Sequence, residues 1–352
     1  MTKAAAVSPE APLLTLAIPT YNRAGFLRQN LETLFEQLVK ELRMELIISD
    51  NCSTDATPEL VTEFQQRGLS IRYLRNTENL GSNGNILQCY DQARGKYAWV
   101  MGDDDIVVPG GIRRILDLLE QDSYGLVFLT PFVFHDDYRT KYQPRACSRP
   151  ARVIDDSVSF IRNVGQLFLF TTSMIINKQE CTVDLEAIRP LTTTFLIHMG
   201  WQLDRLNVPG KHLLVYETLI GQRVENSSGW GACRVFGVNF MTNLDQLLSP
   251  RSRLACEMRK LMMTNWLPHM VMCIREGTAG PLEAEDMRRT LETLYCTSPR
   301  YWRYWLYVLP LIGLPQGLAR RWYALVTLRN RLRCYRVVEA ARRRLTAPRQ
   351  RS

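Results

Sequence analysis

Three consecutive aspartates, Asp103 to Asp105, directly follow the short apolar run Tyr97 to Met101. Carboxylates this close repel one another unless a positive charge lies among them. Carboxylate oxygens suit Mg²⁺ or Mn²⁺, which typically bind one or two protein carboxylates and complete their coordination with phosphate oxygens. The triplet therefore predicts a divalent cation bound together with a diphosphate substrate. The alternative is a solvated acidic turn that caps a helix beginning near Gly111.

Asp50 is a second acidic candidate, because it ends the apolar run Met44 to Ser49. A carboxylate at this position can accept hydrogen bonds from a base or a ribose. The alternative for Asp50 is a turn or cap residue, as these are common roles of aspartate.

Two further loops are crowded with polar groups, Pro19-Thr20-Tyr21-Asn22-Arg23 and the loop from Asn79 through Gly81 to Asn85. Neither has the glycine pattern of a dinucleotide site or a P-loop. The alternatives are a surface charge for Arg23 and ordinary turn chemistry for the second loop.

These loops need a scaffold, and the first 130 residues predict one by alternating strand-length apolar runs with helical patterns. We expect strands at Leu14–Ile18, Met44–Ser49, Ile71–Leu74, Tyr97–Met101 and Gly125–Thr130, with helices at 27–38, 57–67, 85–94 and 111–119. Such alternation implies an α/β fold with a mainly parallel sheet, in which ligands bind at the carboxyl ends of the strands. All four polar loops then lie along one edge.

Beyond Thr140 the alternation fades until about Ser228. Phe168 to Asn177 is predicted to form one more strand, followed by helical stretches, and we place the acceptor half of a site there. Residues 234–299 predict helices with apolar faces.

The composition is that of a globular protein: 46% of the 352 residues are hydrophobic and 22% are charged, which excludes a disordered chain. No 20-residue stretch is apolar enough for a confident membrane span. The nine cysteines include no CxxC pair, and residues 1–12 lack a basic region followed by an apolar one. We therefore expect reduced thiols in a cytoplasmic protein, with no secretion signal and no structural zinc.

The net charge of +9 is concentrated in residues 300–352, where 13 arginines and a single acid, Glu339, give +12 and leave −3 for the rest. A basic tail first suggests nucleic acid. Here the arginines are mixed with Trp, Tyr and Leu in residues 301–310 and 321–326, which favours an anionic membrane surface and not nucleic acid. The alternative is a helix that packs on the catalytic domain with a solvated basic face.

Four motifs occur in order: Pro-Thr-Tyr-Asn-Arg at 19–23, Asp-Asn-Cys-Ser-Thr-Asp-Ala-Thr at 50–57, Asn-Leu-Gly-Ser-Asn-Gly-Asn at 79–85, and the aspartate triplet. In this order they resemble the inverting, nucleotide-sugar-dependent family 2 glycosyltransferases of GT-A fold. The resemblance is strong over residues 13–130 and looser to about 230. There the chain looks like abequosyltransferase-like members that build bacterial surface polysaccharides.

The resemblance implies roles for individual residues. The nucleotide sugar would be bound by Pro19, Thr20, Tyr21, Arg23, Asp50, Asn79, Gly81, Asn85, Asp103, Asp104 and Arg223. Within this set Asp50 would contact the base and Asp103 the ribose or sugar, while Asp105 with Asp104 would hold Mn²⁺ or Mg²⁺. It also implies a GT-A catalytic domain over 13–230, with a donor half at 13–130 and an acceptor half at 131–230. The sequence pattern adds a helical region (231–299) and a basic aromatic tail (300–352).

The catalytic base is where the sequence departs from the family. Many members place it in a Glu-Asp pair about 90 residues after the aspartate loop, and no such pair is present here. His198 lies nearest the expected position, and Asp204 follows six residues later. Imidazole can accept a proton near neutral pH, although a structural role in the core is the alternative for His198. Asp136 and Asp137 are weaker candidates, and Trp201 is a candidate for stacking on a sugar.

The sequence and the resemblance together predict an inverting glycosyltransferase that moves a sugar from a nucleotide-diphospho-sugar to a glycan hydroxyl. The expected acceptor is a glycan on polyprenyl diphosphate, as in bacterial relatives, and the expected place is the inner face of the plasma membrane. A nucleotidyltransferase is one alternative, and a non-catalytic scaffold that binds nucleotide sugars or glycans is another.

Overall fold

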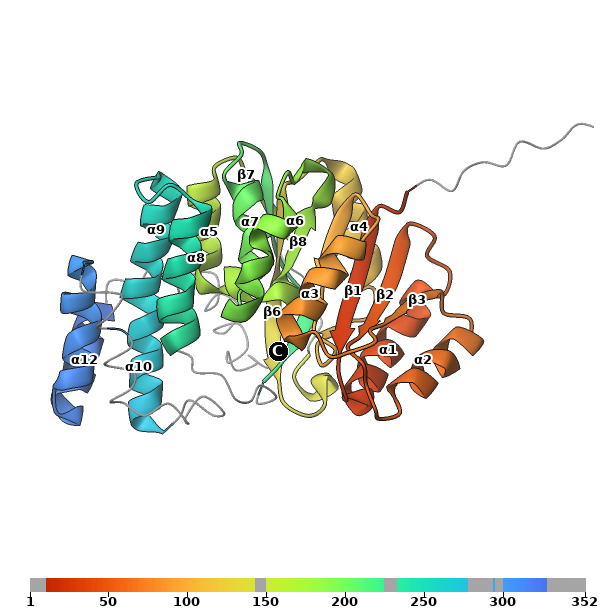
Figure 1. Ribbon diagram of the computed structural model, residues 1–352, viewed down its shortest axis with the longest axis horizontal. Coiled ribbons are helices and arrows are strands. Elements are labelled where there is room, and N and C mark those ends of the chain that lie inside the picture. Colours follow the sequence, from red (N-terminus) through yellow and green to blue (C-terminus); the bar gives the residue numbers. More distant parts are fainter. Residues whose placement is uncertain (1–10, 143–149, 225–232, 278–293, 295–299, 328–352) are drawn as a thin grey trace, which may run out of the picture.

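A computed structural model describes residues 11–142, 150–224, 233–277, 294 and 300–327. Within these ranges the strands form a nine-stranded sheet (Figure 1). They are β1 (Leu14–Thr20), β2 (Met44–Asp50), β3 (Ile71–Arg75), β4 (Tyr97–Val100), β5 (Ile106–Val107), β6 (Leu126–Phe134), β7 (Ala151–Ile154), β8 (Met174–Asn177) and β9 (His212–Arg223).

The strand order is β3-β2-β1-β4-β8-β6-β9-β5, and β7 pairs with the outside of β9. β1 runs parallel to β2 and β4, β2 runs parallel to β3, and β6 runs parallel to β9. β8 is antiparallel to both of its neighbours, β4 and β6, so those two strands point the same way. The sheet is therefore mainly parallel, as the sequence predicts, and the carboxyl ends of β1, β2 and β4 meet at one edge.

Helices cover both faces of this sheet. Buried side chains of α1 (Ala24–Leu38), α2 (Thr57–Gln66) and α4 (Gly111–Gln121) share one apolar cluster. Those of α3 (Gly81–Gln92), α5 (Ser157–Val164) and α7 (Met199–Leu206) share the other. In α1 the buried leucines recur at positions 27, 31, 34 and 38, which is the spacing of a single helical face. The four-residue α6 (Leu185–Ile188) precedes α7.

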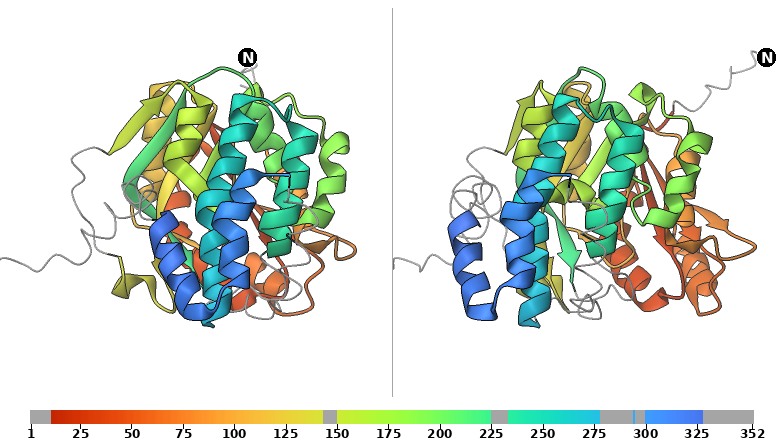
Figure 2. Two further views of the ribbon diagram at one scale, coloured as in Figure 1. Left: turned by 90° about the vertical axis from the view of Figure 1, so that its left-hand side faces the viewer. Right: turned by 60° about the vertical axis from the view of Figure 1, so that its left-hand side comes forward.

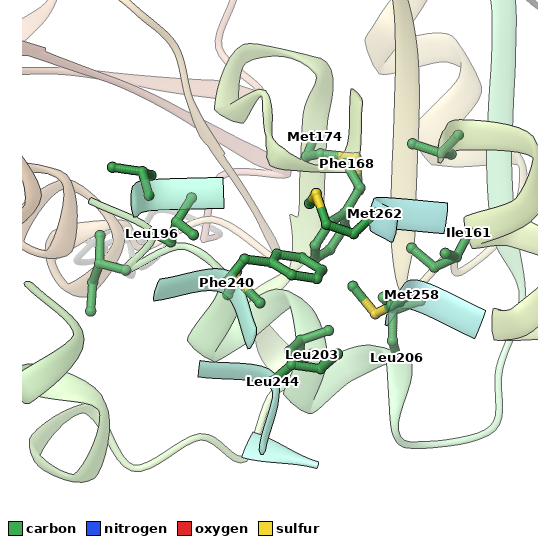
Figure 3. Close-up of a cluster of buried hydrophobic side chains, with 14 of the residues drawn as sticks. Ile161, Phe168, Met174, Leu196, Leu203, Leu206, Phe240, Leu244, Met258 and Met262 are labelled. Carbon is green, nitrogen blue, oxygen red and sulfur yellow. The ribbon is translucent and has the colours of Figure 1, made fainter. Parts of the chain in front are cut away.

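The C-terminal helices extend the second face outward (Figures 1 and 2). α8 (Phe240–Leu247), α9 (Arg253–Leu261), α10 (Leu267–Glu276) and α12 (Leu309–Gly313) contribute buried residues to the same apolar cluster as α7. Figure 3 shows Phe240, Met258 and Met262 of this region lying beside Ile161 of α5 and Leu203 of α7. The expectation of helices after residue 234 is confirmed for the described residues.

Two expectations for the middle of the chain are wrong. Phe168 to Asn177 does not form one strand: residues 168–173 lie in short 3₁₀ turns, and only Met174–Asn177 is extended. The turns bring Thr172 against the loop after β4, where its hydroxyl and its carbonyl both form hydrogen bonds. The twelve-residue β9 was not expected, because its apolar start gives way to the polar residues of its second half.

Within the described ranges, none of the helices has the length and apolar character needed to traverse a bilayer.

A buried arginine ties the far end of the sheet to α7. Arg205 forms an ion pair with Glu180 at 2.6 Å and donates to the carbonyl of Val208 at 3.1 Å. A Cβ on Gly125 would lie 2.3 Å from Arg205 Cζ, and one on Gly210 would lie 2.2 Å from Nη2. The guanidinium is thus held between two glycines, with no room for any side chain there.

We predict that Gly125→Ala lowers the free energy of unfolding by about 3 kcal/mol, because the new methyl group displaces a buried, paired charge. Thermal and denaturant unfolding measure this loss. The matched control is Gly25→Ala in α1, where a Cβ meets nothing within 4 Å. Equal stability of the Gly125→Ala variant and the wild type would contradict the proposed packing.

Candidate active site

The loops after β1 and β2 are held together by their own polar side chains. Asn22, with a φ of 52°, accepts a hydrogen bond at Oδ1 from the N–H of Thr54 at 2.7 Å. The Asp55 carboxylate accepts from the N–H of Ala24 at 2.9 Å and so satisfies a free donor at the start of α1. These motif residues shape the loop that leaves Tyr21 at its tip 42% exposed.

Asn51 connects the second loop to the third and was missed by sequence reasoning. Its Nδ2 donates to Asn79 Oδ1 at 2.7 Å, and its Oδ1 accepts from the N–H of Leu80 at 2.9 Å. Asn85, which is buried, accepts from the Ser49 hydroxyl at 2.6 Å. The asparagines of the third motif therefore position the loops against the end of β2. The only available sequence signal for Asn51 was its place directly after Asp50.

Asp50 is fully buried at the carboxyl end of β2. One carboxylate oxygen accepts from the Tyr73 hydroxyl at 2.5 Å, and the other from the N–H of Ser53 at 2.8 Å. Arg75 Nε lies 3.6 Å away. Burial and the Asp50 carboxylate both raise the pKa of the Tyr73 phenol. Tyr73 and Arg75 come from β3, whose sequence does not mark them as site residues.

Asp103 lies at the same edge, beside the first loop. Its Oδ2 accepts from the Thr20 hydroxyl at 2.8 Å, and its Oδ1 lies 3.3 Å from Arg23 Nε. Arg23 Nη2 reaches the next carboxylate, Asp104, at 2.5 Å. Thr20, Arg23, Asp103 and Asp104, four residues predicted to bind the nucleotide sugar, are thus brought together.

Asp105 turns to the other side of the loop, away from β1. Its Oδ2 accepts from the Thr172 hydroxyl at 2.5 Å and its Oδ1 from the backbone N–H of Arg223 at 3.0 Å. Thr172 also accepts from the N–H of Gly102 at 3.0 Å. Residues from two distant segments therefore fix this carboxylate, and sequence reasoning missed Thr172.

The Arg223 side chain spreads over the same loop and fastens it. Its Nε donates to the carbonyl of Asp104 at 3.3 Å, and Nη1 donates to the carbonyls of His135 and Asp136. The guanidinium also stacks on Phe134, with Cζ 4.6 Å from the ring centroid. Arg223 thus lies next to the aspartates, and its predicted contact with the nucleotide sugar stays a prediction. Residues 225–230 of its loop lie outside the described residues.

Burial raises the pKa of the Asp103 carboxyl to about 7, with the Arg23 guanidinium acting in the opposite direction. Burial, reinforced by the charge of Asp104, raises the pKa of Asp105 well above its usual value. Charged carboxylates are costly in such surroundings. A bound cation would offset this cost and favour their ionised forms.

The chemistry of the loop fits a divalent cation. A Cβ on Gly102 would lie 2.9 Å from Asp104 Oδ1 and 3.0 Å from Asp105 Oδ2, so both oxygens converge on space that only glycine leaves open. Within the described part of the chain, no group of three or more His, Cys, Asp or Glu side chains is arranged to hold a metal ion. Two carboxylate oxygens completed by phosphate oxygens match the usual Mg²⁺ arrangement.

His198 lies immediately before α7 and lines a small cavity behind the aspartate loop. Val100, Thr171, Trp201 and Gln202 are among the other lining residues. His198 Nε2 and Gln202 Oε1 are buried there without a hydrogen-bond partner. Burial lowers the pKa of His198 to about 4, opposed by a hydrogen bond to the backbone of Leu169. The imidazole is therefore neutral at pH 7.

Of the acidic candidates for the base, Asp136 lies near the aspartate loop through its carbonyl, which accepts from Arg223, whereas Asp204 does not. Asp204, near the far end of α7, accepts from the N–H of Thr182 at 2.9 Å. Thr182 follows β8 on the side away from the aspartate loop, so the structure separates Asp204 from the site. Asp137 caps a short turn through the N–H of Arg139. Trp201 stacks on Tyr90 with ring centroids 4.2 Å apart and is buried, which opposes stacking on a sugar.

We predict that His198→Gln reduces the pH dependence of stability. A histidine with a folded pKa near 4 and an unfolded pKa near 6.5 stabilises the fold above pH 6.5, and this contribution is lost as the pH falls towards 4. The wild type should therefore lose about 2 kcal/mol more than the variant between pH 7 and pH 5. Thermal unfolding across that range tests this. If the stability of the wild type and of His198→Gln fell equally between pH 7 and pH 5, His198 would not be held neutral in the fold.

Residues 15–179 match the model of glycosyl transferase family 2. The chain is 34% identical over 216 residues to the abequosyltransferase RfbV of Salmonella typhimurium, which covers 56% of this chain and 62% of that protein. It is 26% identical over 206 residues to GalNAc(5)-diNAcBac-PP-undecaprenol beta-1,3-glucosyltransferase of Campylobacter jejuni, covering 55% of this chain and 65% of that protein. The matches thus span less than two thirds of these relatives.

The crystal structure of S. aureus TarS 1–349 superposes with a TM-score of 0.58 at 12% identity and covers 94% of this chain and 91% of that one. The same protein in complex with UDP gives a TM-score of 0.55. This likeness confirms the expected GT-A-type α/β fold with its helical C-terminal region. Residues 15–179, just under half of the chain, are thus similar to glycosyl transferase family 2.

Proposed function

We propose that this chain is an inverting glycosyltransferase that moves a sugar from a nucleotide-diphospho-sugar to a hydroxyl of a glycan acceptor. The observation that carries the proposal is the convergence of Asp104 and Asp105 oxygens over Gly102, at the carboxyl edge of a mainly parallel sheet. Ligands of such sheets bind at this edge. The match of residues 15–179 to glycosyl transferase family 2 supports the same activity.

Breaking the bond between sugar and diphosphate develops negative charge on the leaving group, so the site must supply positive charge. Asp104 and Asp105 would hold Mn²⁺ or Mg²⁺, which supplies that charge when bound. Thr172 and the N–H of Arg223 orient the Asp105 carboxylate for this role. Arg23, which lies beside Asp103 and Asp104, would contact the diphosphate.

The remaining contacts to the donor follow from position. Asp50, next to Tyr73 and Arg75, would bind the base, and Asp103 would bind the ribose or sugar. Pro19 and Tyr21 would form the wall of the nucleotide pocket. As the catalytic base we propose His198 and not Asp204. His198 and Thr171 line the same cavity, and the next residue, Thr172, contacts the aspartate loop.

We propose a lipid-linked glycan as the acceptor, in bacterial surface-polysaccharide synthesis. The matched Campylobacter relative acts, by its name, on an undecaprenol-linked oligosaccharide, and this supports a similar acceptor class here. Residues 13–130 would then form the donor half and residues 131–230 the acceptor half. Such an acceptor lies at the inner face of the plasma membrane, which is where we place the enzyme.

An anionic membrane surface fits the described part of the tail, residues 300–327, which contains arginines but no aspartate or glutamate. Trp302 and Trp305 are 59% and 46% exposed, and Leu325 is 65% exposed. Exposed tryptophan favours the headgroup region, and arginine attracts anionic lipid. Residues 328–352, which hold most of the basic tail, lie outside the described residues.

We predict that wild-type protein incubated with Mn²⁺, membrane extract and a panel of UDP, GDP, CDP and dTDP sugars releases nucleoside diphosphate from one of them. Asp105→Asn should reduce this release about a hundredfold or more, because the cation loses a ligand. Asp91→Asn, on the exposed side of α3, is the matched control. Release at the wild-type rate from Asp105→Asn would remove the metal role, and no release from any sugar would favour a non-catalytic scaffold.

We further predict that the double variant Trp302→Glu/Trp305→Glu binds vesicles of anionic phosphatidylglycerol about tenfold more weakly than the wild type, because two anchors become charges. Co-sedimentation with vesicles measures this. The control is Leu42→Glu, which changes a side chain that is 94% exposed in the turn before β2. Equal binding of all three proteins would contradict a membrane role for the 300–327 surface.

A further inference from the structure

Arg23 differs from the other arginine at the aspartate loop in what its guanidinium contacts. Its ion-pair partners are Asp103 and Asp104, and its Cζ lies 4.8 Å from the centroid of the Phe26 ring. Its Nε is buried and lies 3.3 Å from Asp103 Oδ1 without forming a hydrogen bond. The contact between Arg23 Nε and Asp103 is therefore an ion pair without a hydrogen bond, and it leaves the Nε–H donor unsatisfied.

Arg223 contacts the same phenyl ring, with Cζ 5.3 Å from its centroid. Its side-chain donors go to the carbonyls of Asp104, His135 and Asp136 and to the Gln29 side chain. These partners are neutral carbonyl and amide oxygens, and they are not part of the proposed site for the diphosphate or the cation. Arg223 thus acts as a fastening for the loop, whereas Arg23 neutralises the carboxylates themselves.

A cation bound by Asp104 and Asp105 would compete with Arg23 for the same negative charge. Arg23 Nη2 contacts Asp104 Oδ2, while Asp104 Oδ1 points to the space over Gly102 together with Asp105 Oδ2. One carboxylate group would then have a guanidinium on one oxygen and a divalent cation on the other. Two positive charges at that separation repel each other strongly in a partly buried site.

We propose that Arg23 is an exchangeable counter-cation: it neutralises Asp103 and Asp104 while the donor is absent and moves to the diphosphate when the cation and nucleotide bind. This inference rests on the proposed function. The exchange is feasible because the Arg23 side chain is 32% exposed. Arg23 is also the residue before α1, and its backbone is not helical. Phosphate oxygens also offer a guanidinium two parallel hydrogen bonds, including one for the donor that is unsatisfied now.

The proposal predicts that Arg23→Gln changes the affinity for Mn²⁺ and the affinity for the nucleotide in opposite directions. In Arg23→Gln, Mn²⁺ should bind about tenfold more tightly without nucleotide, because the competing charge is gone. In the presence of Mn²⁺, the nucleoside diphosphate that the wild type binds best among UDP, GDP, CDP and dTDP should bind about tenfold more weakly, because it loses its guanidinium. A merely structural role for Arg23 would weaken both.

The Mn²⁺ signal in electron paramagnetic resonance gives the first constant, and calorimetry with the nucleotides gives the second. Arg28→Gln, which removes an exposed partner of Glu63 one turn further along α1, should leave both unchanged. Arg23→Lys, which retains the positive charge, should bind Mn²⁺ as the wild type does. It controls for a loss of folding in Arg23→Gln. Mn²⁺ binding that is unchanged, weaker or undetectable in Arg23→Gln overturns the proposal. Neither readout needs turnover, so an inactive sugar panel would refute the proposed activity without touching this result.

Discussion

The surplus of negative charge at the end of β4 is the constraint on which the site depends. Three adjacent carboxylates, two of them almost fully buried, would be costly to ionise without compensation. The compensation comes from three directions: Thr20 and Arg23 after β1, Thr172 before β8, and the backbone of Arg223 at the end of β9. None of these elements is next to the triplet in sequence.

This constraint explains features of the fold that are otherwise irregular. β8 begins only at Met174, and the turn before it brings the Thr172 hydroxyl to Asp105. β9 continues for twelve residues, far enough for its last residue to reach the same carboxylate. Residues from before and after position 130 therefore build this candidate site jointly.

The C-terminal helices serve a different purpose from the sheet. Their apolar faces join the cluster that covers α7, so they are part of the same body and not a loose appendage. Beyond α10, the outer residues of the 300–327 segment combine exposed tryptophan and leucine with arginine. Exposed aromatic and basic residues of this kind are consistent with the proposed membrane-anchored acceptor.

The sequence by itself determined the strands that begin before residue 130, apart from the two-residue β5, together with the four polar loops and the place of Asp50 and Asp103–Asp105 at strand ends. These follow from local patterns, since apolar runs of strand length define the strands and the ends of parallel strands share an edge. The tertiary structure alone decided which groups surround those aspartates. Thr172 and Arg223 lie 67 and 118 residues from Asp105, and no local pattern couples residues so far apart. The sequence also could not place His198 and Asp204 relative to the aspartates. His198 is buried behind the loop, and Asp204 lies near the far end of α7. The burial and direction of these side chains depend on what packs against the helix.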